Sequence, residues 1–247
     1  GFKKAGFPIS VAMDSSAAAI RTHKRNFPKT DSVVADLLDL QPEGVVARVR
    51  EKLSAGCRIG VIGGPPCQGF SRANTQRQDN DPRNDFPALY LDIVSRLKST
   101  FVVEFVVFEN VLGIRDKRHS ATYSRLVEGL QKLDFDVVEN ELCALDFGTP
   151  QNRHRIVISA MLKGKGYSDI APRKRRGTLT VRQAIGELAA PMFFERGLDP
   201  KKFPSHPNHW TMRPKSARFK NPDELKGDGR SFKRLEWDKA SPTIAFG

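Results

Sequence analysis

Residues 58–71 read RIGVIGGPPCQGFS, a short apolar run that stops at two glycines and two prolines. A run of this kind, bounded by turn residues, indicates a buried strand that ends in a tight loop. Pro65 and Pro66 stiffen the loop, and Cys67 follows them at the exit of the strand. A thiol in this position can be exposed and directed toward a ligand, although a single loop cysteine is more often without a role.

The segments on both sides of this loop alternate between apolar runs and amphipathic stretches. We expect further strands at Ile9–Asp14, Phe101–Phe108, Asp136–Leu142 and Arg155–Ala160. The helical spacing predicts helices from a cap at Ser15 to Asn26, at Phe86–Lys98 and at Tyr123–Leu133. Strands and helices in alternation, with continuously apolar strands, predict a mostly parallel sheet that helices cover on both faces. The fold class is therefore α/β, of the doubly wound type.

From about Gly164 the periodicity is lost, apart from a helical stretch around Val181–Leu188. The charge changes at the same place. Residues 1–162 hold 22 Lys and Arg against 19 Asp and Glu, whereas residues 163–247 hold 19 against 9. A basic lobe beside a near-neutral body is typical of proteins that hold a polyanion, nucleic acid above all, although membranes and acidic proteins also attract such surfaces. The RKRR run at Arg173–Arg176 fits a phosphate-binding patch or a solvated linker equally well.

Some classes of protein are disfavoured by the composition. No apolar run approaches the roughly 20 residues that span a bilayer, and the first residues lack the pattern of a signal peptide. The three cysteines, Cys57, Cys67 and Cys143, are far apart and predict neither a disulfide framework nor a zinc site. His206 and His209 have no acid or cysteine cluster beside them. We expect a cytoplasmic protein with no membrane contact and no metal.

Ligands of open α/β sheets bind beyond the carboxyl ends of the strands. Glu109-Asn110-Val111 follows one expected strand, and a partly desolvated carboxyl there can hold a proton near neutral pH. Asp14 and Asp36 lie where nucleotide-type cofactors receive hydrogen bonds. In QNRHR at residues 151–155, two arginines with alternate spacing point to the same side of an extended chain. Each of these signals is weak alone.

Together the motifs resemble the DNA cytosine-5 methyltransferases, of the prokaryotic restriction-modification type. PPCQGFS at 65–71 is similar to the family's nucleophile loop, ENV at 109–111 to its acid motif and QNRHR at 151–155 to its paired-arginine motif. DPRND at 81–85 and SPTI at 241–244 also match, in the usual order. The resemblance implies a Rossmann-like, S-adenosylmethionine-dependent fold. It implies a catalytic domain at 1–163, a target recognition region at 164–239, and a return to the catalytic domain at 240–247.

The resemblance also implies a role for each matched residue. Cys67 would attack carbon 6 of a cytosine flipped out of duplex DNA, and Glu109 would hold ring nitrogen 3. Arg155 would contact the cytosine O2, and Arg153 would support the nucleophile loop. Residues 68–85 would close over the base. The expected DNA contacts are Gln68, Ser71, Arg72, Arg213 and Arg218, the last two because their side chains supply donors suited to base edges and phosphates.

S-adenosylmethionine is the implied methyl donor, with S-adenosylhomocysteine as product. Asp14 would bind the ribose hydroxyls and Asp36 the adenine amino group. Many relatives place a bulky aromatic directly after the ribose acid, and Ser15 stands there instead. The full set of implied cofactor contacts is Asp14, Ser15, Asp36, Leu37, Pro66 and Leu89.

Two family motifs have no counterpart in the sequence. GFKKAGF at 1–7 resembles the segment directly after the family's glycine-rich turn, and the family's last helical motif lies beyond SPTI. We expect flanking segments or a second polypeptide to complete the cofactor site. An RNA cytosine-5 methyltransferase acting on transfer RNA, and a catalytically silent DNA-binding fragment, are the alternatives. On DNA, the protein would associate with the nucleoid.

Overall fold

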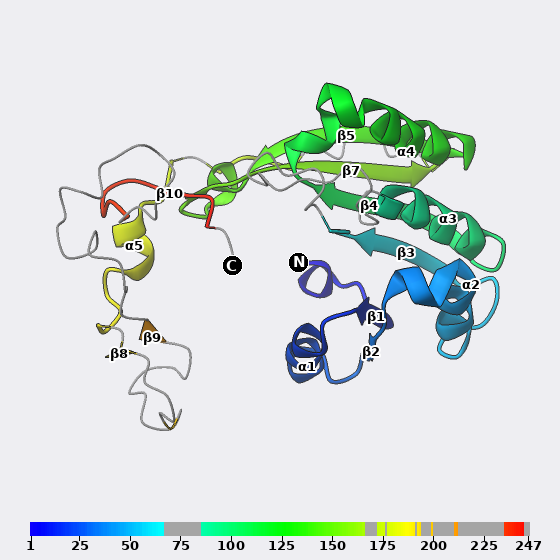
Figure 1. Ribbon diagram of the computed structural model, residues 1–247, viewed down its shortest axis with the longest axis horizontal. Coiled ribbons are helices and arrows are strands. Elements are labelled where there is room, and N and C mark those ends of the chain that lie inside the picture. The colour runs from blue at the N-terminus through cyan, green and yellow to red at the C-terminus, as the bar shows by residue number, and fades with distance from the viewer. Residues whose placement is uncertain are drawn as a thin grey trace. The chain divides into compact units, whose positions relative to one another are not determined.

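The computed structural model describes residues 1–66, 85–165, 172–175, 177–190, 192–193, 199, 210–211 and 235–244. The chain divides into two compact units (Figure 1). The first comprises Gly1–Leu142 and His154–Pro172, and the second comprises Cys143–Arg153 and Arg173–Gly247. The predicted domain limits at residues 163 and 239 stay a prediction.

The first unit contains a four-stranded sheet with the strand order β3-β4-β7-β5. β3 (Arg58–Gly63) pairs in parallel with β4 (Val102–Asn110), and β4 pairs antiparallel with β7 (His154–Leu162). β5 (Phe135–Cys143) lies on the far side of β7. A separate parallel pair joins β1 (Val11–Asp14) to β2 (Asp31–Val34). The predicted α/β class is confirmed, with β7 as an antiparallel member of the sheet.

Helices α2 (Leu37–Arg50), α3 (Phe86–Lys98) and α4 (Ser120–Lys132) pack side by side, α3 in the middle and against β4 (Figure 1). α1 (Ala17–Asn26) packs on β1 and β2. The core between these helices and the sheet is apolar and closed to solvent. Its fully buried side chains include Val94, Leu130, Phe108 and Ile158.

The structure corrects two predicted boundaries that bear on function. α1 is capped by Ser16, whose hydroxyl accepts from the backbone N–H of Ala19 at 3.2 Å, and not by Ser15. The reason is that the Asp14 carboxylate accepts from the Ser16 N–H at 2.7 Å and places Ser16 at the cap. Strand β4 continues two residues beyond Phe108, so Glu109 lies within the strand.

Within the part of the first unit that the structure describes, three short 3₁₀ helices are also present: η1 (Phe2–Ala5), η3 (Leu112–Arg115) and η4 (Lys117–His119). η1 is held by aromatic contacts, because the rings of Phe2 and Phe7 lie 5.9 and 5.4 Å from the ring of Phe105. Among the described residues, no helix is both long and apolar enough to cross a lipid bilayer.

The second unit has little regular structure among its described residues. It contains η5 (Ala144–Phe147), α5 (Val181–Ile185) and two short parallel pairs, β6 (Gln151–Asn152) with β10 (Ser241–Pro242) and β8 (Met192–Phe193) with β9 (Trp210–Thr211). α5 opens with a capping box between Thr180 and Gln183 and stops at Ile185, short of the predicted Leu188. Arg182 of α5 is paired with Asp238 at 2.7 Å.

Candidate active site

The two glycines at the end of β3 are packed against different neighbours. A Cβ on Gly63 would lie 2.4 Å from the ring of Tyr90, so only glycine fits above this buried tyrosine. A Cβ on Gly64 would lie 3.3 Å from a carboxylate oxygen of Glu109. The chain that leads to Pro65 and Pro66 therefore passes directly beside the carboxylate at the end of β4.

Asn110 ties the same chain to β4. Its side chain is 1% exposed, and its amide donates to the carbonyl of Pro65 at 3.4 Å while its carbonyl accepts from the N–H of Val111 at 2.9 Å. A buried amide is costly unless it is hydrogen-bonded, so these bonds fix the loop entrance relative to the acid. Pro65 is two residues before Cys67.

Tyr90 of α3 connects β3 and β4 through its hydroxyl. Its hydroxyl donates to the carbonyl of Val107 at 2.9 Å and lies 3.4 Å from the carbonyl of Val61. Burial raises the pKa of the Tyr90 hydroxyl well above its ordinary value, so the group stays a neutral donor. β3 and β4 are thereby held in fixed register next to the site.

Glu109 and Arg155 form an ion pair across β4 and β7. The Arg155 Nε lies 3.0 Å from a Glu109 oxygen, with the arginine side chain 17% exposed and the carboxylate 43% exposed. A second guanidinium nitrogen of Arg155 donates to the carbonyl of His154 at 2.7 Å. The pair combines a partly exposed carboxylate with an anchored cation beside the end of β3. Such a pair can hold a polar, planar ligand by its edge.

The other predicted carboxylates lie at the carboxyl edge of β1 and β2. Asp14 ends β1 in register with Val34 of β2, and Asp36 follows two residues later as the cap of α2. Each is exposed, and each uses one oxygen for a backbone N–H, that of Ser16 for Asp14 and that of Leu38 for Asp36. Since a carboxylate offers about four lone-pair sites, each retains capacity for a ligand.

These two acids fit the nucleoside part of S-adenosylmethionine, whose ribose hydroxyls and adenine amino group are hydrogen-bond donors. Of the other predicted cofactor contacts, Ser15 and Pro66 are exposed, Leu37 is half-buried and Leu89 is buried in the core. Their roles stay predictions.

Several predicted residues cannot be placed in this site. Arg153 belongs to the second unit, where its carbonyl accepts from the N–H of Ala144 at 2.9 Å. The other predicted site residues lie outside the described residues, and they are Cys67, Gln68, Ser71, Arg72, Arg213 and Arg218. His206, His209 and residues 68–84 of the predicted closing loop also lie outside the described residues.

The second unit brings together two motifs that are 90 residues apart in the sequence. β10 of SPTI pairs with β6 of QNRHR, and the Thr243 hydroxyl donates to the Asn152 carbonyl at 2.8 Å. The sequence alone did not link these two motifs. It also gave no role to Asn110, which belongs to the ENV motif, or to Tyr90, which no sequence pattern marked.

Comparison with known proteins identifies the family of this chain. Residues 1–220 match the family model described as C-5 cytosine-specific DNA methylase. The Type II methyltransferase M.XorII of Xanthomonas oryzae is 34% identical over 192 residues, which is 76% of this chain and 43% of that protein. The Type II methyltransferase M.MthTI of Methanothermobacter thermautotrophicus is 29% identical over 250 residues, covering 100% of this chain and 68% of that protein.

Solved structures agree with the fold. A chain described as a DNA modification methyltransferase encoded within an E. coli prophage superposes with a TM-score of 0.60 at 29% identity, over 76% of this chain and 51% of that one. Spodoptera frugiperda DNMT2 superposes with a TM-score of 0.55 at 23% identity, over 81% and 56%. This chain thus spans about half the length of several relatives that it matches. It belongs to the C-5 cytosine-specific DNA methylase family.

Proposed function

We propose that the protein methylates carbon 5 of cytosine in a specific duplex DNA sequence, with S-adenosylmethionine as donor and Cys67 as covalent nucleophile. One observation supports this function most directly. Pro65, two residues before Cys67, is hydrogen-bonded to Asn110, and the preceding Gly64 lies beside Glu109, which is itself paired with Arg155. An acid and a cation are thus held beside the chain that leads to the proposed nucleophile.

Cytosine is electron-poor at carbon 6 and a weak nucleophile at carbon 5, so direct methylation is slow. The Cys67 thiolate forms a bond to carbon 6, and a proton held between Glu109 and ring nitrogen 3 draws the electrons into the ring. Carbon 5 becomes enamine-like and accepts the methyl group. Loss of the carbon 5 proton and expulsion of Cys67 then restore the aromatic ring.

The ion pair sets a condition on this step. A carboxylate bound to a guanidinium accepts hydrogen bonds and donates none, and nitrogen 3 of cytosine is also an acceptor. Contact between Glu109 and the base therefore requires a proton between them. We infer that Arg155 transfers part of its hydrogen bonding from Glu109 to the cytosine O2 when the base enters.

S-adenosylmethionine supplies an electrophilic methyl group on a sulfonium centre. In this proposal Asp14 and Asp36 bind its nucleoside from the carboxyl edge of β1 and β2, where both carboxylates are exposed. Additional polypeptide, in the same chain or from a partner, would complete the site. In support, among the strands that the structure describes, β1 pairs with β2 alone and β3 with β4 alone, which leaves one edge of each unpaired.

Completion of the site has a direct test. Calorimetric titration of residues 1–247 with the cofactor should show weak binding that rises when further polypeptide of the natural protein is supplied. Micromolar binding by the 247 residues alone would contradict the need for additional polypeptide.

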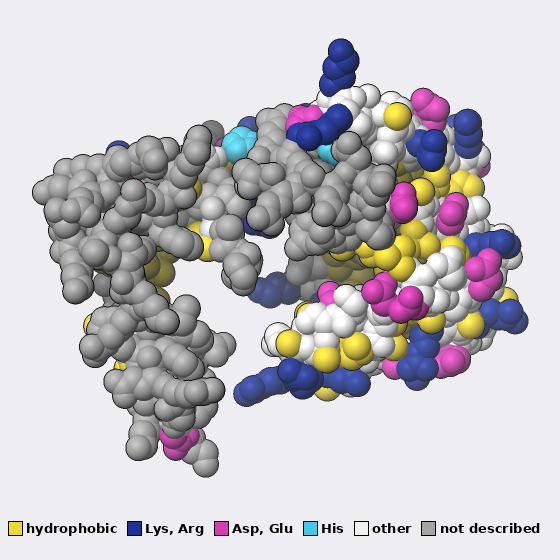
Figure 2. All heavy atoms as spheres, in the orientation of Figure 1, with side chains coloured by type: hydrophobic (Ala, Val, Ile, Leu, Met, Phe, Trp, Pro, Cys, Tyr) yellow, Lys and Arg dark blue, Asp and Glu magenta, His cyan; other side chains and the backbone are white. Residues whose placement is uncertain are grey.

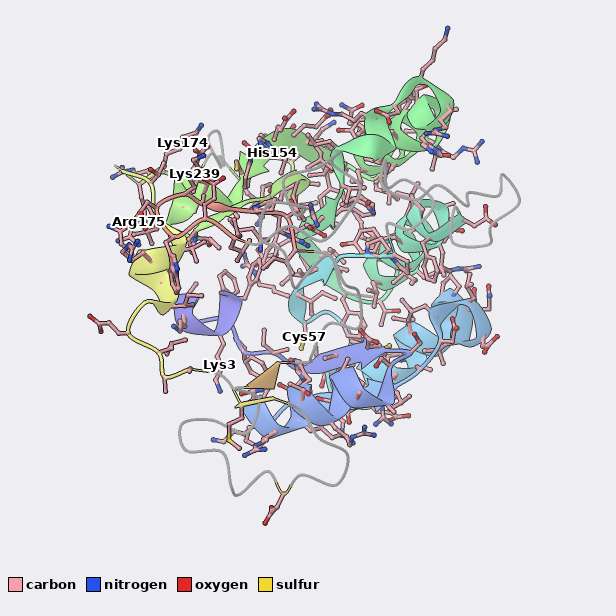
Figure 3. The ribbon with its side chains drawn as sticks, turned by 60° about the vertical axis from the view of Figure 1, so that its left-hand side comes forward. Lys3, Cys57, His154, Lys174, Arg175 and Lys239 are labelled. Carbon is pink, nitrogen blue, oxygen red and sulfur yellow. The ribbon has the colours of Figure 1, made fainter. Side chains whose placement is uncertain are left out.

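DNA binding would come mainly from the basic second unit. Flipping a base costs a few kcal/mol, and phosphate contacts offset that cost. Within this unit Lys174 is paired with Asp146 at 2.8 Å, which raises the lysine's pKa, and Arg175 packs beside Gly148 (Figure 3). Arg213 and Arg218 are proposed as contacts that influence sequence choice. A protein with this function would work in the cytoplasm, at the nucleoid.

A methyl transfer assay separates the proposal from its alternatives. With labelled S-adenosylmethionine, we expect label in duplex DNA and none in transfer RNA. The Glu109→Gln variant should label duplex DNA at no more than about 1% of the wild-type rate. Preferential labelling of transfer RNA would favour an RNA methyltransferase. DNA binding without any labelling would favour a silent fragment.

A further inference from the structure

The near-neutral balance of residues 1–162 conceals a strongly uneven distribution. Residues 1–30 carry six lysines and arginines against a single acid, whereas residues 31–162 carry sixteen against eighteen. We call the six the α1 basic patch. Its members are Lys3, Lys4, Arg21, Lys24, Arg25 and Lys29.

Four members of the patch lie together on the first unit. Arg21, Lys24 and Arg25 are spaced i, i+3 and i+4 on α1, so their side chains emerge on one side of the helix. Lys3 of η1 reaches the same helix end, because its ammonium lies 5.3 Å from the ring centre of Phe27 (Figure 3). All six side chains are exposed, and dark blue side chains gather over α1 at the lower edge of the unit in Figure 2.

The charges of the patch are not neutralised within the described part of the chain. Some cations elsewhere in this unit are paired, for example Arg48 with Asp31 at 2.7 Å and Arg115 with Glu141 at 2.6 Å. Among the described residues, no ion pair or hydrogen bond to a patch side chain is found. The helix dipole favours cations in the last turn, which accounts for Lys24 and Arg25 but not for the members outside that turn.

The patch lies away from the candidate active site. α1 begins beyond the carboxyl end of β1 and runs back, so its last turn is near the amino end of β2. Glu109 and Arg155 lie at the carboxyl end of β4. Asp14, the single acid among the first 30 residues, stands at the opposite end of α1 from Arg25. A ligand on the patch would therefore not compete with the reacting base.

We propose that the α1 basic patch binds the sugar–phosphate backbone of duplex DNA as a second contact that is independent of sequence. The inference rests on DNA being the substrate of the proposed function. Exposed, unpaired cations in a cluster attract a polyanion, and each phosphate neutralised releases counterions into solution. The patch would hold duplex outside the reacting site, so that the protein stays bound between target sequences.

Salt titration of DNA binding tests this proposal. The triple variant Arg21→Gln, Lys24→Gln, Arg25→Gln is compared with wild type on a duplex of alternating A·T pairs, which contains no cytosine. Each lost phosphate contact lowers the slope of log affinity against log salt by about 0.9, so the slope should fall by about two to three. Equal thermal unfolding of both proteins shows that the fold is retained.

A matched variant controls for net charge. Arg50→Gln, Lys52→Gln, Lys132→Gln removes three exposed cations elsewhere in the unit, and should leave the slope nearly unchanged. The charge-conserving variant Arg21→Lys, Lys24→Arg, Arg25→Lys should retain wild-type binding. Three outcomes would overturn the proposal. They are an equal loss of slope in the two neutralised variants, no loss of slope in either, or binding of the patch to anionic lipid vesicles in place of duplex.

The outcome is separable from that of the proposed function. If the patch contributes to duplex binding but no methyl group is transferred, the second contact stands and the enzymatic proposal fails. If methyl transfer occurs and the patch variant binds duplex like wild type, the enzymatic proposal stands and the second contact fails.

Discussion

Gly63 and Gly64 are adjacent in the sequence but have different physical roles. Gly63 lies over the buried ring of Tyr90, so a methyl group there would enter the core. Gly64 lies beside the Glu109 carboxylate, where a methyl group would press on the acid itself. The sequence predicted that the two glycines end a strand, but it did not distinguish them.

We predict that Gly64→Ala lowers the rate of methyl transfer several-fold while the melting temperature changes little. The added Cβ displaces the carboxylate by a few tenths of an ångström, and small misplacements of a reacting group are costly. Gly63→Ala is the matched contrast. It should destabilise the fold by about 1–3 kcal/mol, because it overpacks the core. Equal effects of both substitutions on melting and rate would contradict these roles.

Tyr90 predicts a dependence of stability on alkaline pH. Burial raises its pKa in the folded state, so the unfolded chain loses this proton first as the pH rises. Its stabilising contribution is complete below the unfolded pKa of about 10 and declines above it, by up to ~1.4 kcal/mol per pH unit. Denaturant unfolding between pH 9 and about 11 should show a smaller loss for Tyr90→Phe than for wild type. An unchanged pH dependence would refute the assignment.

The positions of the two arginines of QNRHR could not be predicted from their spacing alone. Alternate spacing places both on one side only if the strand is continuous. β6 ends at Asn152 and β7 starts at His154, so Arg153 lies between two strands and in the second unit. Arg155 is paired with Glu109, a contact between strands that spacing along one segment cannot reveal.

At the scale of elements, the cap of α1 gives a sensitive comparison. Ser16→Ala removes the hydroxyl that accepts from Ala19 and should cost about 1 kcal/mol of unfolding free energy. Ser15→Ala removes a neighbouring hydroxyl that does not cap the helix, and should change stability by less than about 0.5 kcal/mol. Chemical denaturation measures both, and the reverse order would restore the cap predicted from the sequence.

Most helices and strands of the first unit could be predicted from periodicity, and α3 has the predicted bounds of Phe86–Lys98. α2 was missed because Pro42 interrupts its pattern. In the structure the helix is broken at Gln41, whose φ is 56°, and continues from Pro42. Pro42 and Val45 are buried against the core. A proline can begin a helical segment, since its missing N–H would have no partner there. This helix therefore depends on burial against the core, which cannot be predicted from the local sequence.

For the whole molecule, the α/β rule that ligands bind at carboxyl ends of strands was informative, since Asp14, Asp36 and Glu109 all lie there. The average charge was less informative. It located basic character in the second unit but did not reveal the α1 basic patch, because acids in residues 31–162 offset it in the total.

The charge of the second unit leads to a graded prediction. Neutralising Arg173, Lys174, Arg175 and Arg176 together should weaken binding to all duplex sequences alike and reduce its salt dependence. Lys174→Gln alone should contribute least, because Lys174 is already paired with Asp146. Filter binding on several duplexes at a series of salt concentrations measures both effects. Sequence-dependent losses would show that these residues read bases and not phosphates.

The central claim is that Cys67 bonds covalently to cytosine, and a mechanism-based trap tests it most directly. Fluorine at carbon 5 cannot leave as the proton does, so duplex DNA with 5-fluorocytosine in the target sequence should remain attached to the natural full-length protein after methyl transfer. We predict a denaturant-resistant adduct, mapped by peptide mass analysis to Cys67, which is lost in Cys67→Ser and retained in Cys57→Ser and Cys143→Ser. An adduct at Cys57 or Cys143, or DNA methylation that persists in Cys67→Ser, would contradict it.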